Sequence, residues 1–399
     1  MRKPVITGVS VATSIGSTTE EYWEKLNQGA CGIARIDRYD ASTFPVQYAG
    51  MVQPFEGETV IRKRLVPQTD RMTRIALACA AAAIDDAHLD LEAADPYDVG
   101  LAITSSTGGL EFGQTELGNL WRDGWESVSP YMSFAWYYAV NTGQVSIANG
   151  LRGPGCVTLS EQAGGLDSIA HAARRLAKGT AAMIVGGIDS MLCPYGLAIL
   201  GVAKGINRTM DPSSYRPFSP ESAGYFPGEG GAIMVLERWD HTNPARAYAQ
   251  VSGYAAAFDP NEGSDAGYLA AVRGSLARAE LAARDIDLVF ADGWGAPEPD
   301  AVEAATLTDL FGDQIPVTVP KVATGRLLGG GGSTDVAAAS LALKEQVIPP
   351  CPKAAGGQIL DASLPGLVTA STPAELGNVL VVSRGHGGFV SALVLSRVS

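Results

Sequence analysis

The chain has 399 residues, 46% of them hydrophobic, which is enough for two domains of ordinary size or one large duplicated fold. Its formal net charge of −13 argues against nucleic acid as the main partner, because binding to phosphates needs clustered lysine and arginine side chains. No stretch has the apolar length of a bilayer-spanning helix, so we expect a cytoplasmic protein without membrane association. The cysteine spacing predicts neither a zinc site nor a disulfide framework, and we expect no metal or other cofactor; the five are Cys31, Cys79, Cys156, Cys193 and Cys351.

In the first half of the chain, strand patterns alternate with helical ones. Residues 5–12 have the composition of a first strand, and a helix with a threonine cap and an acidic first turn follows up to about residue 28. Asp70 then precedes an alanine-rich segment with apolar residues at helical spacing, which predicts a long helix packed closely on a neighbour. We predict further strands at residues 99–105, 157–159 and 182–185, and a helix at 163–177.

The same alternation begins again near residue 250. Strands are predicted at residues 248–256, 286–291, 315–319, 379–383 and 389–395, and helices at 267–282, 301–310 and 333–345. Strands that alternate with helices indicate a layered α/β fold. Because each half has its own set, we expect an internal duplication, with one domain at residues 1–248 and the other at 249–399.

The segment from Val157 to Asp167 has the layout of a strand that leads through a turn into a helix. The positive end of a helix dipole lowers the pKa of a thiol placed there and stabilises an oxyanion, so this is where a thiol-dependent acyl transferase would place its nucleophile. The turn contains Ser160, Glu161 and Gln162 but no cysteine. An ordinary helix cap explains this segment by itself better than a catalytic turn does.

Two other features predict structure more strongly than chemistry. The run Gly329–Gly332 could cradle a phosphate at a helix start, but the GxxxxGK[ST] and GxGxxG patterns are absent, and close chain packing is the better interpretation. His386 lies in a glycine-rich turn and could face a pocket. However, no Ser-His-Asp triad can be assembled from the sequence, and GxSxG is absent.

Taken together, these segments resemble the β-ketoacyl synthase (thiolase-like) family along nearly the whole chain. Active members carry a cysteine three residues before the glycine of a Gly-Leu-Asp run, and anchoring on residues 165–167 places Gln162 at that position. The resulting Ser-Glu-Gln-Ala-Gly-Gly at residues 160–165 is similar to the motif of the chain-length factors, the ketosynthase β subunits of type II polyketide synthases. Other family landmarks follow in order at residues 65–70, 134–143 and 227–231.

The resemblance implies that the catalytic residues have been replaced. Asp292 stands at the position of the first family histidine and Arg326 at that of the second, whereas Lys321 is retained. All three catalytic residues of the family are therefore replaced, the cysteine by Gln162 and the two histidines by Asp292 and Arg326. This points to a lineage that no longer uses them, so we expect no condensing residue in this chain.

The family also implies a fold, partners and a role. The expected fold is the five-layered αβαβα arrangement of two similar halves. The expected partners are a catalytic ketosynthase α subunit, in a heterodimer, and an acyl carrier protein that delivers malonyl units. The β subunit would form part of the tunnel that holds the growing poly-β-ketone, and tunnel volume would limit chain length.

By resemblance, Leu110, Gly113 and Leu117 line that tunnel. Their spacing of three and four puts them on one side of a helix, which is also the spacing of a helix face packed on a core. None of the three is aromatic and one has no side chain, so we expect a roomy tunnel and a product of decaketide length or longer.

Three alternative functions differ in class. Gln162, helped by Lys321 or Asp292, could decarboxylate malonyl-carrier protein and supply an acetyl primer, because an amide can polarise a thioester. Ser160 could act as an acyl-transferring nucleophile, although no base is visible for it. The chain could also be a purely structural homodimer.

Overall fold

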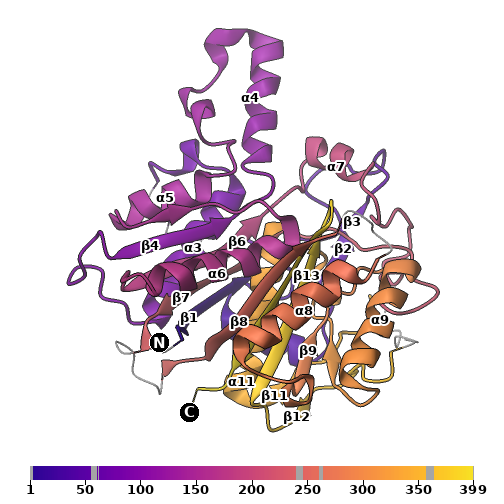
Figure 1. Ribbon diagram of the computed structural model, residues 1–399. Helices are drawn as coiled ribbons and strands as arrows, with labels where there is room; N and C mark the ends of the chain where they lie inside the picture. Colours follow the sequence, from indigo (N-terminus) through magenta and orange to yellow (C-terminus); the bar gives the residue numbers. More distant parts are fainter. Residues whose placement is uncertain are drawn as a thin grey trace.

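A computed structural model describes residues 3–54, 61, 63–239, 246–259, 264–355 and 364–398. In Figure 1 helices pack on both sides of a large twisted sheet, and the two ends of the chain lie near each other. The sheet has ten strands: β1 (Val5–Ala12), β4 (Val99–Thr104), β5 (Gly155–Cys156), β6 (Ala182–Asp189), β7 (Gly230–Glu237), β8 (Ala249–Phe258), β9 (Leu288–Phe290), β10 (Val317–Thr318), β13 (Asn378–Gly385) and β14 (Phe389–Ser396).

The strand order repeats in mirror image about the centre of this sheet. One side runs β1-β7-β6-β4-β5 and the other runs β8-β14-β13-β9-β10. In each series the first three strands pair antiparallel and the last three pair parallel, and β1 meets β8 through Val5 and Ile6. The repeat supports the proposed division of the chain at residues 248 and 249, because β8 opens the second series at Ala249.

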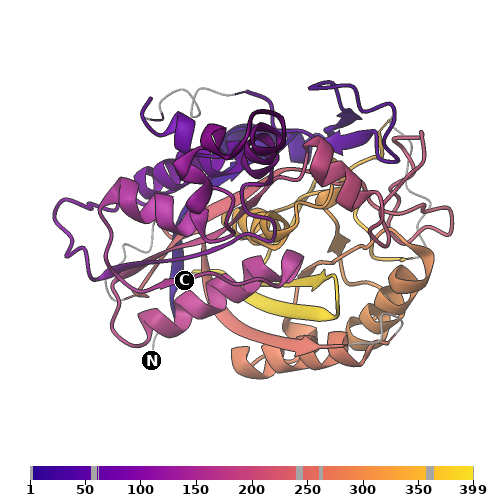
Figure 2. The same cartoon turned by 90° about the horizontal axis from the view of Figure 1, so that it is seen from above.

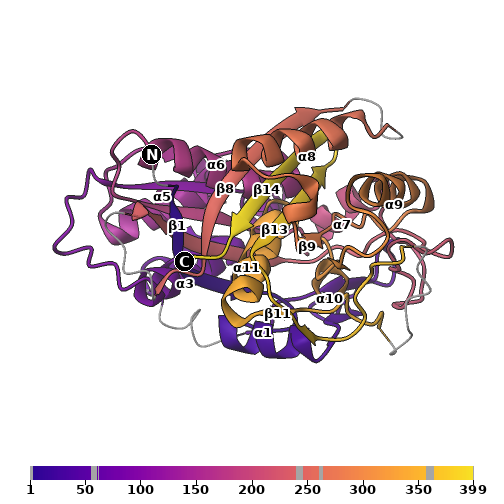
Figure 3. The ribbon, with the colours of Figure 1, turned by 60° about the horizontal axis from the view of Figure 1, so that its bottom comes forward.

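The helices complete five layers. The outer layers contain α3 (Arg71–Asp86) and α5 (Val140–Asn149) on the first series, and α8 (Ala266–Ala279) on the second, where Figure 3 shows it over β8 and β14. Between the two series lie α6 (Gly164–Leu176) and α11 (Gly329–Glu345). Helix α11 lies in the middle of the molecule in Figure 2. The five-layered fold predicted from the resemblance is therefore confirmed.

The rest of the described chain forms further helices and short strands. The helices are α1 (Thr19–Asn27), α4 (Leu110–Asp123), α7 (Pro194–Leu200), α9 (Pro297–Phe311) and α10 (Lys321–Thr324), and the short strands are β2 (Ile33–Arg35), β3 (Tyr48–Gly50), β11 (Val347–Ile348) and β12 (Thr372–Pro373). Single 3₁₀ turns occur at Val66–Gln68, Trp125–Ser127, Pro130–Ser133, Glu161–Ala163 and Ala283–Asp285. Within the described ranges, none of the helices has both the length and the apolar character needed to cross a membrane.

The cap signals in the sequence act as expected. Thr18 Oγ1 accepts a hydrogen bond from the Glu21 amide at 3.2 Å, and Asp70 Oδ1 accepts one from the Met72 amide at 2.8 Å. Several predicted boundaries were wrong: the helix predicted from residue 301 begins at Pro297, and the strand predicted at 182–185 continues to Asp189. The strand predicted at residues 157–159 lies earlier, at Gly155–Cys156, and the helix predicted from Ser333 begins four residues sooner, at Gly329.

Tertiary packing explains the early start of α11, because glycine alone disfavours helix. A side-chain carbon added at Gly331 would lie 1.5 Å from Gln162 Oε1, and one at Gly165 would lie 2.2 Å from the Ser333 amide nitrogen. The close crossing of α6 and α11 therefore requires glycine. The four glycines Gly329–Gly332 are all buried, which confirms close packing as their role.

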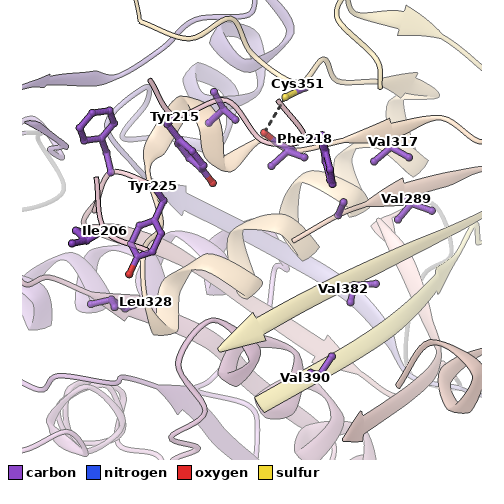
Figure 4. Close-up of a cluster of buried hydrophobic side chains, with 14 of the residues drawn as sticks. Ile206, Tyr215, Phe218, Tyr225, Val289, Val317, Leu328, Cys351, Val382 and Val390 are labelled. Atoms are coloured by element: carbon purple, nitrogen blue, oxygen red, sulfur yellow. Dashed lines mark hydrogen bonds between the residues drawn. The ribbon is translucent and has the colours of Figure 1, made fainter. Parts of the chain in front are cut away.

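A large apolar cluster underlies the loops of the second half. Figure 4 shows part of it, with Tyr225, Ile206 and Leu328 at one end and side chains of β9, β10, β13 and β14 at the other. The labelled members lie on these four strands and on loops from both halves of the chain, so the cluster supports the frame on which the candidate site is built.

Candidate functional site

Three chain segments meet at the carboxyl ends of the central strands. Gln162 lies on the 3₁₀ turn that leads into α6, Asp292 follows β9, and Arg326 follows α10. The end of β13 closes the group, since a side-chain carbon added at Gly385 would lie 2.4 Å from the Ser160 carbonyl oxygen. The structure thus brings together the three positions that the sequence singled out.

Gln162 is enclosed by protein. Its side chain has no solvent-exposed surface, and it lies against the backbone of Gly331 on α11. Neither Oε1 nor Nε2 has a hydrogen-bond partner among the residues that the structure describes. A buried amide without partners costs free energy, roughly 1–3 kcal/mol, so this side chain is not placed here for stability.

Asp292 and Arg326 form a buried ion pair. Arg326 Nη1 lies 3.1 Å from Asp292 Oδ2, Nη2 lies 3.2 Å from Oδ1, and both side chains are at most 1% exposed. Burial alone would raise the pKa of Asp292, but the positive charges of Arg326, Arg384 and Lys321 hold it well below its ordinary value. The pair engages both carboxylate oxygens of Asp292 and both Nη groups of Arg326, whereas Arg326 Nε has no hydrogen-bond partner among the described residues.

A second arginine, which the sequence analysis missed, completes the cluster. Arg384 Nε lies 3.2 Å from Asp292 Oδ2, and its Nη2 lies 2.6 Å from Glu303 Oε2. Glu303 also accepts hydrogen bonds from the amides of Asp292 and Gly293, so it fixes the loop after β9. Two carboxylates and two guanidinium groups therefore balance in charge at the centre of the site.

Aromatic rings cover Arg326 on the pocket side. Its guanidinium carbon lies 4.6 Å from the centre of the Trp294 ring and 5.4 Å from that of Tyr225. His386 packs edge-on against Trp294 at 4.7 Å and its Nε2 lies 2.7 Å from the Tyr225 hydroxyl oxygen. A cavity of about 250 Å³ opens beyond these rings, lined in part by Trp294, Arg384 and Gly385.

Glu161 has an unusual backbone and an unusual carboxyl group. Its φ of +52° lies in the left-handed region, which costs a residue with a side chain roughly 1–3 kcal/mol and occurs most often at functional sites. Burial raises its pKa to about 7, against the opposing charge of Arg326, and its Oε2 accepts a hydrogen bond from the His386 amide. No sequence signal predicts this conformation.

Lys321 is held away from the cluster. Its Nζ lies 2.6 Å from Asp335 Oδ2 on α11 and donates to the Ala291 carbonyl oxygen at 3.0 Å. Both charged side chains are 2% exposed. The retained lysine thus links the loop after β9 to the central helix, through an aspartate that the sequence analysis did not single out.

The three candidate tunnel residues form a separate group on α4. This helix projects from the body of the molecule in Figure 1. Leu110 is partly buried, Gly113 is buried against Trp136, and Leu117 is 41% exposed. Their helical spacing is confirmed: Leu110 packs against the core and Gly113 is buried, whereas Leu117 is exposed.

Apolar packing of Leu110 holds the start of α4, and polar contacts hold the helix further along. Gln114 Oε1 accepts a hydrogen bond from the Tyr195 amide at 2.6 Å, and Glu116 Oε2 accepts one from the Ser129 amide at 2.7 Å. Glu116 is 8% exposed, whereas the apolar Leu117 is 41% and Trp121 is 84% exposed. A helix with polar groups inward and large apolar groups outward is typical of a surface that another chain covers.

Comparison with known proteins decides the family. Residues 1–241 match the family model of the β-ketoacyl synthase N-terminal domain, and residues 248–354 match that of the C-terminal domain. The tetracenomycin polyketide synthase ketoacyl synthase beta subunit of Streptomyces glaucescens is 44% identical over 406 residues, which cover 98% of each protein. The chain belongs to the β-ketoacyl synthase family. Within it, the chain groups with the ketosynthase β subunits, also called chain-length factors.

Solved structures agree on the fold of this β-ketoacyl synthase. A β-ketoacyl synthase from Burkholderia phymatum STM815 matches with a TM-score of 0.89 at 22% identity, and the ishigamide ketosynthase/chain length factor matches with 0.86 at 24%. Each comparison covers the full length of both chains.

The cysteine side chains of this chain lie outside the turn at Ser160–Gln162, where an active relative would place its nucleophile. All five cysteines are free. Burial raises the pKa of Cys79 and Cys351 to about 12 and that of Cys193 to about 11, so these three are protonated at neutral pH. The turn at Gln162 therefore has an amide enclosed by protein and offers no thiolate to form a thioester.

Proposed function

We propose that this chain is the non-condensing, chain-length-determining subunit of a type II polyketide synthase. It pairs with a catalytic ketosynthase α subunit, which takes malonyl units from an acyl carrier protein and carries the growing chain. The observation that carries the proposal is the closed Asp292–Arg326 ion pair beside Gln162, because it fills the catalytic positions of the family with side chains that pair with each other.

The outward face of α4 supports the pairing. One relative is named as a ketoacyl synthase beta subunit, and one solved structure is named as a ketosynthase/chain length factor, which fits a pairing of two such chains. Leu117 and Trp121 are too large and too exposed for a surface that stays in water, and an α subunit would bury them. In that position α4 forms part of the tunnel wall, with Leu110, Gly113 and Leu117 towards the poly-β-ketone.

The size of these side chains supports a long product. Gly113 has no side chain, and Leu110 and Leu117 are smaller than aromatic residues, so the wall leaves room for a chain of decaketide length or longer. A bulkier residue at these positions would block the path, and each further extension would then meet a steric penalty.

The test is to co-express the chain with its α subunit and carrier protein and to measure product length. Gly113→Phe and Leu117→Trp should shorten the product while the yield of heterodimer stays the same. Gly118→Phe is the matched control. Gly118 lies on the same helix, about 140° around it from Gly113, and a β-carbon added there would have no neighbour within 4 Å. Unchanged product length in both test variants would refute the proposal.

The unpartnered amide of Gln162 supports a second candidate function, decarboxylation of malonyl-carrier protein to supply a primer. A free amide donor could polarise the thioester carbonyl. Release of carbon dioxide by the purified chain and its loss in Gln162→Ala would support this role. Equal release by both proteins would contradict it.

A further inference from the structure

The N-terminus of α4 has no cap of its own. The residue before the helix is Gly109, which has no side chain to accept a hydrogen bond from the free amides of the first turn. That turn contains Leu110 and Gly113, two of the three candidate tunnel residues. Whatever satisfies these amides therefore also fixes where the candidate tunnel wall begins.

Asp70 supplies the missing cap from another helix. Its Oδ2 accepts a hydrogen bond from the Phe112 amide, in the first turn of α4, at 2.8 Å. Its Oδ1 accepts one from Met72, in the first turn of α3, at the same distance. The side chain is 4% exposed, and a side-chain carbon at Gly109 would lie 2.9 Å from Asp70 Cβ. One buried carboxylate thus caps two helices and meets the positive ends of both dipoles.

A second buried carboxylate anchors the loop that leads into α4. Asp189 Oδ1 accepts from the Ser105 hydroxyl at 2.7 Å, and its Oδ2 accepts from the Ser106 amide at 2.7 Å. The same Oδ2 accepts from the Gly329 amide, at the start of α11, at 2.8 Å. The loop is therefore tied to the central layer, and Asp70 holds the helix that follows it.

The length of α4 amplifies a change at this end. The helix has 14 residues and is about 21 Å long, and Leu117 lies about 10 Å from its start. A tilt of about 5° at the base would move the Leu117 position by about 1 Å, roughly two-thirds of a carbon–carbon bond. The cap fixes the base of α4, and the hydrogen bonds of Gln114 and Glu116 hold the helix further along.

We propose that Asp70 is a positioning residue for chain length: by capping α4 it sets where Leu110, Gly113 and Leu117 stand in the tunnel wall. This inference rests on the proposed function, and it adds a specificity determinant that does not itself touch the polyketide.

Serine at position 70 separates the two caps. A serine hydroxyl can still accept from the Met72 amide and cap α3, but it is too short to reach Phe112. Asp70→Asn is the second variant: it keeps the shape of the side chain but has a single acceptor oxygen, so it can cap only one of the two helices. Thr18→Ala is the matched control, since Thr18 caps α1 in the same way.

Two measurements on the purified heterodimer test the proposal. In Asp70→Ser, hydrogen exchange at the Phe112 amide should be about fivefold faster, as expected for loss of one helix cap, while exchange in the first turn of α3 stays near that of the unmodified protein. The ratio of shorter to full-length product should change at least about twofold at equal heterodimer yield. Thr18→Ala should change neither quantity.

The outcomes separate this proposal from the proposed function. If Gly113→Phe shortens the product but Asp70→Ser and Asp70→Asn leave the product ratio unchanged, the positioning role is refuted and the proposed function stands. Unchanged exchange at Phe112 in Asp70→Ser would also refute it. If Gly113→Phe and Leu117→Trp leave length unchanged, the proposed function fails, and with it the role of Asp70 in specificity.

Discussion

Removing the carboxylate of Asp292 should destabilise the protein more than removing its partner Arg326. Asp292 lies within 3.2 Å of two buried arginines, so Asp292→Ala leaves two positive charges facing each other. Deleting one partner of a buried ion pair costs about 3–5 kcal/mol. In Arg326→Met the carboxylate keeps Arg384, and we expect a smaller loss of about 2 kcal/mol.

A double-mutant cycle measures the coupling. Asp292→Ala with Arg326→Met should cost at least about 1 kcal/mol less than the sum of the single changes, because the double variant leaves one fewer unpaired buried charge. The assay is urea-induced unfolding followed by circular dichroism and by tryptophan fluorescence. Glu221→Ala is the control, because it removes a half-exposed pair with Arg216 and should cost less than about 1 kcal/mol. Additive effects, or a loss below about 1 kcal/mol for Asp292→Ala, would refute the assignment of a buried ion pair.

Three further predictions concern the turn at Gln162. Gly331→Ala should destabilise the protein by about 1–3 kcal/mol in urea unfolding, and Gln162→Ala in the same chain should restore most of that loss, because Gln162 supplies the atoms that the new methyl group would meet. In Gln162→Cys, alkylation at position 162 should be at least about tenfold slower than at the exposed Leu159→Cys, as read by site-resolved mass spectrometry; equal rates would contradict the burial. The pKa of Glu161 is raised to about 7, so its carboxyl favours folding when protonated, below about pH 4.5, and this contribution is lost as pH rises to about 7. Glu161→Gln should therefore gain stability relative to the unmodified protein above pH 7, by at most about 3 kcal/mol, and an unchanged difference between pH 5 and 8 would contradict this.

Much of the fold could be predicted from local patterns. The first strand, residues 5–12, was placed correctly, and Asp70 marked the start of α3, because both signals depend on neighbouring residues. The early start of α11 could not be predicted. Glycine disfavours helix locally, and only the close crossing with α6 makes the glycines Gly329–Gly332 the residues that fit.

The sequence named positions for the candidate site but none of its contacts. Resemblance to the family singled out Gln162, Asp292 and Arg326, but a matched motif carries no information on which side chains pair. Arg384 meets Asp292 across 92 residues of sequence. The cap that Asp70 makes on α4 could not be predicted either. A sequence pattern indicates the cap of the helix that follows directly, α3, but not that of a helix beginning 40 residues later.

The outward direction of the apolar residues on α4 was also beyond sequence reasoning. The spacing of Leu110, Gly113 and Leu117 is that of a helix face packed on its own core. In the structure Leu110 packs against the core and Gly113 is buried, but Leu117 is exposed while the neighbouring Glu116 is buried. A periodic pattern identifies a face but does not say which neighbour covers it.

The central claim is that this chain shapes the chamber of another subunit's reaction and forms no acyl-enzyme of its own. Intact-mass spectrometry of the reconstituted heterodimer, after incubation with malonyl-loaded carrier protein, tests it most directly. The account predicts acyl mass on the α subunit and an unmodified mass for this chain. Acyl mass on this chain, in the heterodimer or in the purified chain alone, would contradict it.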